Sequence, residues 1–226
     1  MAVGFEYGKE NMTNLTERLE KCYTGAVYDI LRERGITNTI LPKDLRPIDP
    51  SKTLAGPVFT VTGSPKAGLD AHESLLRWTE FLSLVPEGSV AVSTGQDMDR
   101  ALMGELSAET LQFRGVRGYV TDGGCRDCDF IINIGFPVFA RFYTPRDVVG
   151  AWTPDSFEEP LDFCGVTVRT GDYIIADMDG AVVIPGDIAE AVIGEVEVIM
   201  QTENLVRKAI LEGVSPKDAY LQYGKF

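Results

Sequence analysis

The segment with the clearest chemical potential is residues 118–127. A predicted strand at 118–122 ends in a Gly-Gly turn, and Arg126 and Asp127 follow this turn. Loops at strand ends carry many functional groups. The carboxylate of Asp127 can bind a hard divalent ion such as Mg²⁺, which takes oxygen ligands and keeps several waters. Arg126 can hold an anionic oxygen through a forked pair of hydrogen bonds. A surface ion pair after a turn is the alternative that these residues alone leave open.

A second group of candidates lies upstream, at residues 104–107. This segment is expected close to a helix start, where free backbone N–H groups can bind a carboxylate. Glu105 adds a second carboxylate, which could orient water around a metal ion. Together the two groups predict a site for an anionic substrate and a divalent cation.

Four other patterns carry weaker signals. Cys125 and Cys128 form a lone Cys-x-x-Cys, for which two incidental, partly buried thiols are a better interpretation than a redox pair. Residues 177–180 resemble the start of a calcium loop, but a hairpin turn between two strands explains them better. Lys66 would form a Schiff base only if it were buried, and its Pro/Gly loop predicts an exposed side chain. His72 is interpreted as a helix-face residue without a catalytic role.

The composition excludes several classes of function. The chain has 226 residues, with 34 acidic and 21 basic side chains and a formal net charge of −13. Such an acidic chain should not bind nucleic acid or an anionic membrane surface, because both depend on Lys and Arg. A single histidine excludes a zinc site built from two or three histidines within one chain. The start of the chain has no signal-peptide pattern, and we expect a cytoplasmic protein with reduced cysteines.

The hydrophobic pattern predicts an α/β fold. Helices are expected at residues 13–34, 70–84, 101–114 and 126–132, from an N-cap at Asp187 to Gly213, and after Ser215-Pro216. Strands are expected at 57–63, 89–93, 118–122 and 137–141, followed by a meander at 165–168, 173–177 and 181–185. We predict one domain over residues 1–226, in which mixed β-sheets form a layered sandwich flanked by helices and residues 1–12 are an N-terminal extension.

The sequence resembles the RraA-like family, which includes class II 4-hydroxy-4-methyl-2-oxoglutarate / 4-carboxy-4-hydroxy-2-oxoadipate aldolases. In that family an acidic residue is followed, after 20 residues, by Arg-Asp, and Glu105 and Arg126-Asp127 have this spacing. The resemblance runs from about residue 15 to the C-terminus. The segments that carry it are TGAVYDIL (24–31), AGPVFT (55–60), GYVTDG (118–123), GFPVFA (135–140), GDYIIADMDGAVVIP (171–185) and GVSPKDAY (213–220).

The resemblance implies a role for each matched residue. Asp127 would ligate Mg²⁺, Mn²⁺ or another divalent metal directly, with waters completing the shell. Arg126 would contact the 2-keto oxygen of pyruvate and the enolate that develops there. The backbone of Gly104, Glu105, Leu106 and Ser107 would hold the pyruvyl group.

Two acidic residues would complete the site. Glu105 would hold waters around the metal, and it stands where the best-known aldolases carry Asp. Glu203 is a match for a glutamate that a neighbouring subunit donates in the family, also through water. A homotrimer or homohexamer with the site between subunits is therefore implied. The family fold is a swivelling β/β/α sandwich, in agreement with the α/β prediction.

The implied function is metal-dependent aldol cleavage of a 4-hydroxy-2-oxo acid, such as 4-hydroxy-4-methyl-2-oxoglutarate, to pyruvate and a second carbonyl compound. Oxaloacetate decarboxylation passes through the same enolate and is the expected side activity. Two alternatives stay open. The chain could be an RraA-like inhibitor that binds an RNA-degrading endonuclease, or a lyase or decarboxylase that acts on another 2-oxo or sugar acid through the same metal site.

Overall fold

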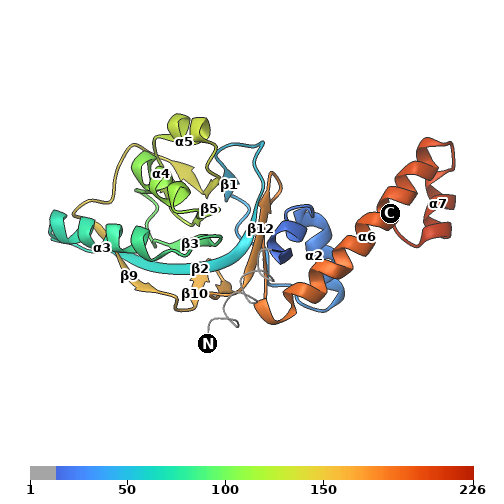
Figure 1. The fold of residues 1–226 in the computed structure, drawn as a ribbon, viewed down its shortest axis with the longest axis horizontal. Helices are drawn as coiled ribbons and strands as arrows, with labels where there is room; N and C mark the ends of the chain where they lie inside the picture. Colours follow the sequence, from blue (N-terminus) through green and yellow to red (C-terminus); the bar gives the residue numbers. More distant parts are fainter. Residues whose placement is uncertain (1–13) are drawn as a thin grey trace.

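One long strand organises the fold. The computed structural model describes residues 14–226, and the predicted extension at residues 1–12 lies outside them. Strand β2 (Leu54–Pro65) pairs with three other strands of the main sheet. In Figure 1 it sweeps along the whole base of the sheet, with helices above it and β12 at its end.

The main sheet is mixed, as the sequence predicts. Its order is β1-β7-β5-β3-β2-β12-β13, and β9 pairs with β2 outside this path. The pairs β2–β3, β3–β5 and β5–β7 are parallel, and the remaining pairs are antiparallel. Besides β2, its strands are β1 (Arg46–Pro47), β3 (Val90–Thr94), β5 (Gly118–Thr121), β7 (Val138–Ala140), β9 (Trp152–Phe157), β12 (Tyr173–Asp177) and β13 (Gly180–Ile184).

A second sheet is small and all parallel. It consists of β4 (Ala101–Met103), β6 (Gly124–Cys125) and β8 (Phe142–Tyr143) in that order. A separate hairpin is formed by β10 (Leu161–Phe163) and β11 (Val166–Val168).

Helices cover the sheets in two groups. Figure 1 shows α3 (Ala71–Leu84), α4 (Glu105–Phe113) and α5 (Cys128–Ile134) over the parallel strands. It shows α2 (Thr24–Glu33) and α6 (Ala189–Leu211) beside β12, and α7 (Pro216–Tyr223) at the far end of α6, away from the sheet. A short 3₁₀ turn, η1 (Gly186–Ile188), precedes α6. No helix within residues 14–226 is long and apolar enough to cross a membrane.

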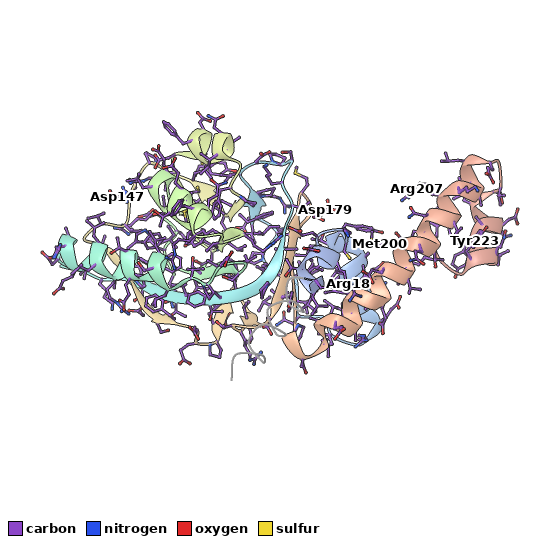
Figure 2. All side chains as sticks on the ribbon, viewed as in Figure 1. Arg18, Asp147, Asp179, Met200, Arg207 and Tyr223 are labelled. Carbon is purple, nitrogen blue, oxygen red and sulfur yellow. The ribbon has the colours of Figure 1, made fainter. Side chains whose placement is uncertain are left out.

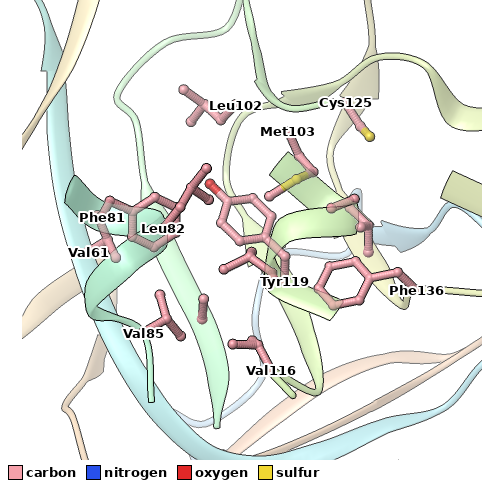
Figure 3. Close-up of a cluster of buried hydrophobic side chains, with 14 of the residues drawn as sticks. Val61, Phe81, Leu82, Val85, Leu102, Met103, Val116, Tyr119, Cys125 and Phe136 are labelled. Carbon is pink, nitrogen blue, oxygen red and sulfur yellow. The ribbon is translucent and has the colours of Figure 1, made fainter. Parts of the chain in front are cut away.

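Each group of helices buries its own apolar cluster. The cluster under α3, α4 and α5 contains Phe81, Tyr119 and Phe136, and Figure 3 shows the Tyr119 ring between the two phenylalanines. A second cluster joins α2 and α6 to β12 and β13, and a third lies between the main sheet and the β10–β11 hairpin. The predicted α/β class, with mixed sheets flanked by helices, is confirmed.

Several predicted boundaries are wrong. Residues 101–103 form strand β4 rather than the first turn of a helix. The predicted helix at 13–34 is interrupted at residues 20–23, where the chain turns before α2. The helix predicted at 126–132 starts at Cys128 instead. Asp187 does not cap α6, because η1 comes first and Ile188 occupies the N-cap position.

Other local predictions are confirmed, and one pairing is not. Asp70 caps α3 by accepting hydrogen bonds from His72 N–H and Glu73 N–H, and Ser215 caps α7 with Pro216 at its first position. β12 and β13 form the predicted hairpin. β11 pairs with β10 rather than with β12, so the predicted three-strand meander does not form.

The bulge of β2 against β9 leaves room for an indole ring. The register between these strands shifts between Thr62 and Gly63, and a Cβ built on Gly63 would lie 2.0 Å from Cζ2 of Trp152. Trp152 is buried, and its indole N–H donates to the Gly95 carbonyl at 2.7 Å. Only glycine therefore fits at position 63 without displacing this tryptophan.

We predict that Gly63→Ala lowers the free energy of unfolding by about 2–3 kcal/mol, because the added methyl group overpacks the core. The measurement is a urea titration followed by far-UV circular dichroism. Gly25→Ala is the matched control: Gly25 lies exposed in α2, and its Cβ would meet only the Tyr23 ring at 3.5 Å. This control should be neutral or up to about 1 kcal/mol more stable. Equal effects of the two substitutions would contradict the packing argument.

Candidate active site

The pairing of β4 with β6 brings the two predicted groups of site residues together. Met103 lies opposite Cys125 in this parallel pair, and the Arg126 N–H donates to the Met103 carbonyl at 2.9 Å. The chain leaves β4 into the first turn of α4 and leaves β6 into Arg126 and Asp127. Residues 104–107 and 126–127 are therefore neighbours, as the sequence analysis predicts.

The backbone of Asp127 is held in an uncommon conformation. Its φ of 54° and ψ of 34° lie in the left-handed region, which Asp tolerates better than most residues. It occupies the N-cap position of α5, yet its side chain makes no capping hydrogen bond there. Instead, Oδ2 accepts a hydrogen bond from the Glu105 N–H at 3.2 Å. The carboxylate thus faces the start of α4, where the partial positive charge of the helix stabilises an anion.

Gly104 makes this close approach possible. A Cβ on Gly104 would lie 2.9 Å from Oδ2 of Asp127 and 3.1 Å from Nε of Arg126. Any larger residue would push both functional side chains away from the helix start. The N–H groups of Leu106 and Ser107 donate to no acceptor within residues 14–226, as is usual in a first helical turn, and they remain available to a ligand.

Arg126 lies between two carboxylates. Its Nε is 3.5 Å from Oδ2 of Asp127, and its Nη1 is 3.4 Å from Oδ2 of Asp147. All three side chains are partly exposed. Asp147 was not predicted from the sequence, and its irregular loop offers no local signal for this contact. In Figure 2 it lies on the side of the molecule opposite α6 and α7.

These residues open into a pocket of about 430 Å³. Its walls come from α3, the start of α4, the end of β4 and the loop at 147–149. Gly104, Glu105, Leu106 and Ser107 all line it, together with Arg126, Asp127 and Asp147. A cavity of this size with a few convergent polar groups is typical of a small-molecule site.

A tryptophan from α3 fixes the back wall of the pocket. The indole N–H of Trp78 donates to Oγ of Ser107 at 2.8 Å, and its ring packs edge-on against Trp152 with centroids 5.9 Å apart. Ser74 Oγ donates to the Trp152 carbonyl at 2.9 Å. The start of α4 is thereby tied to the core. Trp78 does not stand out in the sequence, because a helix-face tryptophan is by itself most often a core residue.

Behind the site, a buried carboxylate holds a neighbouring loop. Oδ1 of Asp122 accepts a hydrogen bond from the Gly95 N–H at 2.6 Å, at the point where β3 ends. Burial raises the pKa of Asp122, and the Gly95 hydrogen bond and the charge of Arg141 oppose this shift. Asp122 does not line the pocket, so its role is to fix the backbone on which Trp152 depends through the Gly95 carbonyl.

The donor set fits a hard divalent cation held mainly by water. No group of three or more His, Cys, Asp or Glu side chains converges anywhere in residues 14–226. Within the same residues, Oδ1 of Asp127 has no hydrogen-bond partner, and Glu105 lines the same pocket. Mg²⁺ is commonly bound through one or two carboxylates and several waters. The residues present therefore suit Mg²⁺ or Mn²⁺ and do not suit a closed zinc site.

The structure does not bring Glu203 to this pocket within its own chain. Glu203 lies on α6, and its Oε2 accepts a hydrogen bond from the Tyr23 hydroxyl. Burial and this contact raise the pKa of Tyr23 to about 12. The contribution of Glu203 to a neighbouring subunit, and the trimer or hexamer that this requires, stay predictions.

None of the weaker candidates lines the pocket. Lys66 is exposed and forms an ion pair with Asp155 at 2.6 Å. His72 is an exposed residue of α3. Cys125 is buried and Cys128 half-buried, and both are free thiols whose pKa values are raised by burial. Residues 177–180 form the hairpin turn between β12 and β13.

Known proteins with similar sequences and structures cover most of the chain. Protein DlpA from Legionella pneumophila is 28% identical over 218 residues, which are 95% of this chain and 34% of that protein. A protein from Halalkalibacterium halodurans, named "Putative 4-hydroxy-4-methyl-2-oxoglutarate aldolase", is 26% identical over 83% of this chain and 85% of its own. The crystal structure of RraAS2 from Streptomyces coelicolor is described as an unusual member of the RNase ES inhibitor RraA protein family. It superimposes with a TM-score of 0.75 at 25% identity, covering 86% of this chain and 96% of that one.

The relatives differ in length. The chain spans about a third of Protein DlpA, whereas it covers most of the Halalkalibacterium protein and of the Streptomyces structure. The model of the RraA-like family, described as Aldolase/RraA, matches residues 24–183. This match includes every pocket residue described above. The chain belongs to the RraA-like family.

Proposed function

We propose that the protein is a divalent-metal-dependent lyase that cleaves a 4-hydroxy-2-oxo acid to pyruvate and a second carbonyl compound. The observation that carries this proposal is the placement of Arg126 and Asp127 against the first turn of α4 inside one pocket. The names of relatives such as the Halalkalibacterium protein support the same reaction class.

The 2-oxo acid end of the substrate would bind at the start of α4. The N–H groups of Leu106 and Ser107 are free to donate to its carboxylate, and the positive end of the helix favours an anion there. The guanidinium of Arg126 would then donate to the 2-keto oxygen. This arrangement orients the C3–C4 bond toward the walls formed by α3 and the loop at 147–149.

Cleavage requires a proton acceptor at C4 and charge stabilisation at C2. Loss of the proton from the C4 hydroxyl lets a C4 carbonyl form as the C3–C4 bond breaks, and the electron pair of that bond moves into the pyruvate enolate. Arg126 would stabilise the enolate oxygen by electrostatic interaction. Glu105, which lines the pocket, would orient the water that accepts the hydroxyl proton. Protonation of C3 then releases pyruvate.

Asp127, assisted by Glu105 through water, would hold the divalent metal. When bound, the metal supplies Lewis-acid stabilisation of negative charge on the keto oxygen. Oxaloacetate decarboxylation would produce the same enolate and is proposed as a side activity. The predicted homotrimer or homohexamer, with Glu203 from a neighbouring chain, belongs to this proposal as well.

The family also contains proteins described as RNase inhibitors, so protein binding is the competing function. The convergence of Arg126 and Asp127 on the first turn of α4 inside one pocket supports the lyase, although inhibitors of the family can keep much of the same motif. A panel of 2-oxo acids, assayed with and without Mg²⁺, separates the functions. Pyruvate release that depends on Mg²⁺ supports the lyase, and the absence of any turnover across the panel would favour the binding protein.

We predict that Asp127→Asn lowers kcat/KM for pyruvate release by at least about a hundredfold, because a neutral amide oxygen holds a divalent cation much more weakly than a carboxylate does. Excess chelator should abolish turnover of the wild-type protein to the same extent, and added Mg²⁺ should restore it. Pyruvate is measured by coupling to lactate dehydrogenase.

Asp129→Asn is the matched control for this substitution. Asp129 is an exposed acid in the first turn of α5, and it does not line the pocket. Its replacement removes the same charge two residues away and should leave the rate within about twofold. Full activity of Asp127→Asn, or turnover that persists in chelator, would contradict the metal-dependent mechanism.

A second prediction concerns the planar guanidinium group of Arg126, as compared with the ammonium group of a lysine. Arg126→Lys keeps the charge but loses the planar fork that donates to the keto oxygen, and we expect kcat to fall by about tenfold or more. The control is Arg146→Lys. Arg146 pairs with Asp99 at 3.2 Å and does not line the pocket. Similar rates for the two lysine variants would show that Arg126 supplies only a diffuse positive charge.

A further inference from the structure

The side chain of Ser107 can bind a ligand in addition to its backbone. We propose, on the basis of the lyase function above, that the Ser107 hydroxyl donates a hydrogen bond to the carboxylate of the 2-oxo acid. We further propose that Trp78 is the positioning residue that directs this hydroxyl. The function above uses only the backbone N–H at position 107, so the hydroxyl adds a side-chain contact to the recognition of pyruvate.

The indole N–H of Trp78 determines how the Ser107 hydroxyl can act. It lies 2.8 Å from Oγ of Ser107, and an indole N–H can only donate. Oγ is therefore the acceptor in this contact, and its own proton must point to another group. That proton has no acceptor within residues 14–226, and Ser107 lines the pocket. A hydroxyl in this state can act as a donor, which is what an anionic ligand requires.

Packing holds Trp78 in this orientation. Trp78 is 8% exposed, and its ring packs edge-on against Phe81 and Trp152, with centroids 5.1 Å and 5.9 Å apart. Trp152 is itself fixed by its hydrogen bond to the Gly95 carbonyl. All of these contacts lie within one chain, so they do not depend on a neighbouring subunit. The hydroxyl is thus oriented before a ligand arrives, which reduces the conformational entropy lost on binding.

The hydroxyl belongs to the helical turn that favours an anion. Ser107 is the third residue of α4, and its nitrogen and Oγ are three bonds apart, so one carboxylate group can accept from both. The Glu105 N–H in the same turn donates to Asp127 instead. A carboxylate at this position would therefore accept from the N–H groups of Leu106 and Ser107 and from the Ser107 hydroxyl.

Removal of the hydroxyl tests the first part of the proposal. Ser107→Ala should raise the Kd for pyruvate about tenfold, measured by titration calorimetry with Mg²⁺ present, because hydrogen bonds to a charged group are among the stronger ones. Ser83→Ala is the matched control. Ser83 is an exposed residue of α3 that does not line the pocket, and its hydroxyl donates to the Thr79 carbonyl. This control should leave Kd within about twofold, and an unchanged Kd in Ser107→Ala would overturn the inference.

A double-mutant cycle tests the role of Trp78. Trp78→Phe keeps an aromatic ring but removes the indole N–H, and it should raise the Kd for pyruvate about threefold because the hydroxyl is no longer directed. In protein that already carries Ser107→Ala, the same substitution should change Kd by less than about 1.5-fold, since no hydroxyl is left to direct. Equal effects in the two backgrounds would show that Trp78 acts only through packing and would overturn its positioning role. The variant with both substitutions has no unpaired indole N–H, so it is the reference if Ser107→Ala alone folds poorly.

Activity and subunit assembly separate this inference from the function on which it rests. If Ser107→Ala still cleaves 4-hydroxy-4-methyl-2-oxoglutarate and binds pyruvate with an unchanged Kd, the inference fails and the lyase function stands. If pyruvate binding needs the hydroxyl in a protein that cleaves no aldol, the lyase function fails and the inference stands. If a neighbouring chain accepts the hydroxyl proton instead, Ser107→Ala should lower the oligomer mass in sedimentation and leave the Kd of the assembled protein unchanged. That result would also overturn the inference.

Discussion

The pairing of two very short parallel strands, β4 and β6, is the constraint on which the site depends. β4 spans three residues and β6 two, yet their register places Met103 opposite Cys125 and fixes the Arg126 N–H on the Met103 carbonyl. The two strands are parallel and therefore end on the same side of the pair. β4 leads into the first turn of α4, and β6 leads into Arg126 and Asp127. A slip of one residue would reverse the side of the sheet to which each side chain points. The hydrogen bond from the Glu105 N–H to Asp127 could not form in that register.

Local electrostatics have to overcome the charge of the whole chain. A net charge of −13 does not attract an anionic keto acid. For the proposed reaction, positive potential would therefore arise within the pocket, from Arg126, from the N–H groups at the start of α4 and from the divalent cation that we propose. Gly104 lets these contributions approach one another, because a side chain there would collide with both Arg126 and Asp127.

Much of the fold and the centre of the site could be predicted from the sequence, because the signals are local. The apolar run before the Gly-Gly pair identified β5, and Asp70 and Ser215 identified the starts of α3 and α7. The chemistry of Arg-Asp after a strand singled out residues 126 and 127. What could not be predicted depends on distant contacts. Residues 101–103 have good helix propensity, and only pairing with residues 124–125 makes them a strand. The contacts of Arg126 with Asp147 and of Trp78 with Ser107 likewise join separate segments of the chain.

The proposed lyase function requires that this pocket stabilise the enolate of pyruvate. The most direct measurement is hydrogen exchange at the methyl group of pyruvate itself, followed by proton NMR in D₂O. With the protein and Mg²⁺ present, the methyl signal should disappear as deuterium enters, far faster than in buffer with Mg²⁺ alone. The exchange should stop when chelator is added. A methyl signal that decays no faster with the protein than without it would contradict the claim, whatever second carbonyl compound the natural substrate contains.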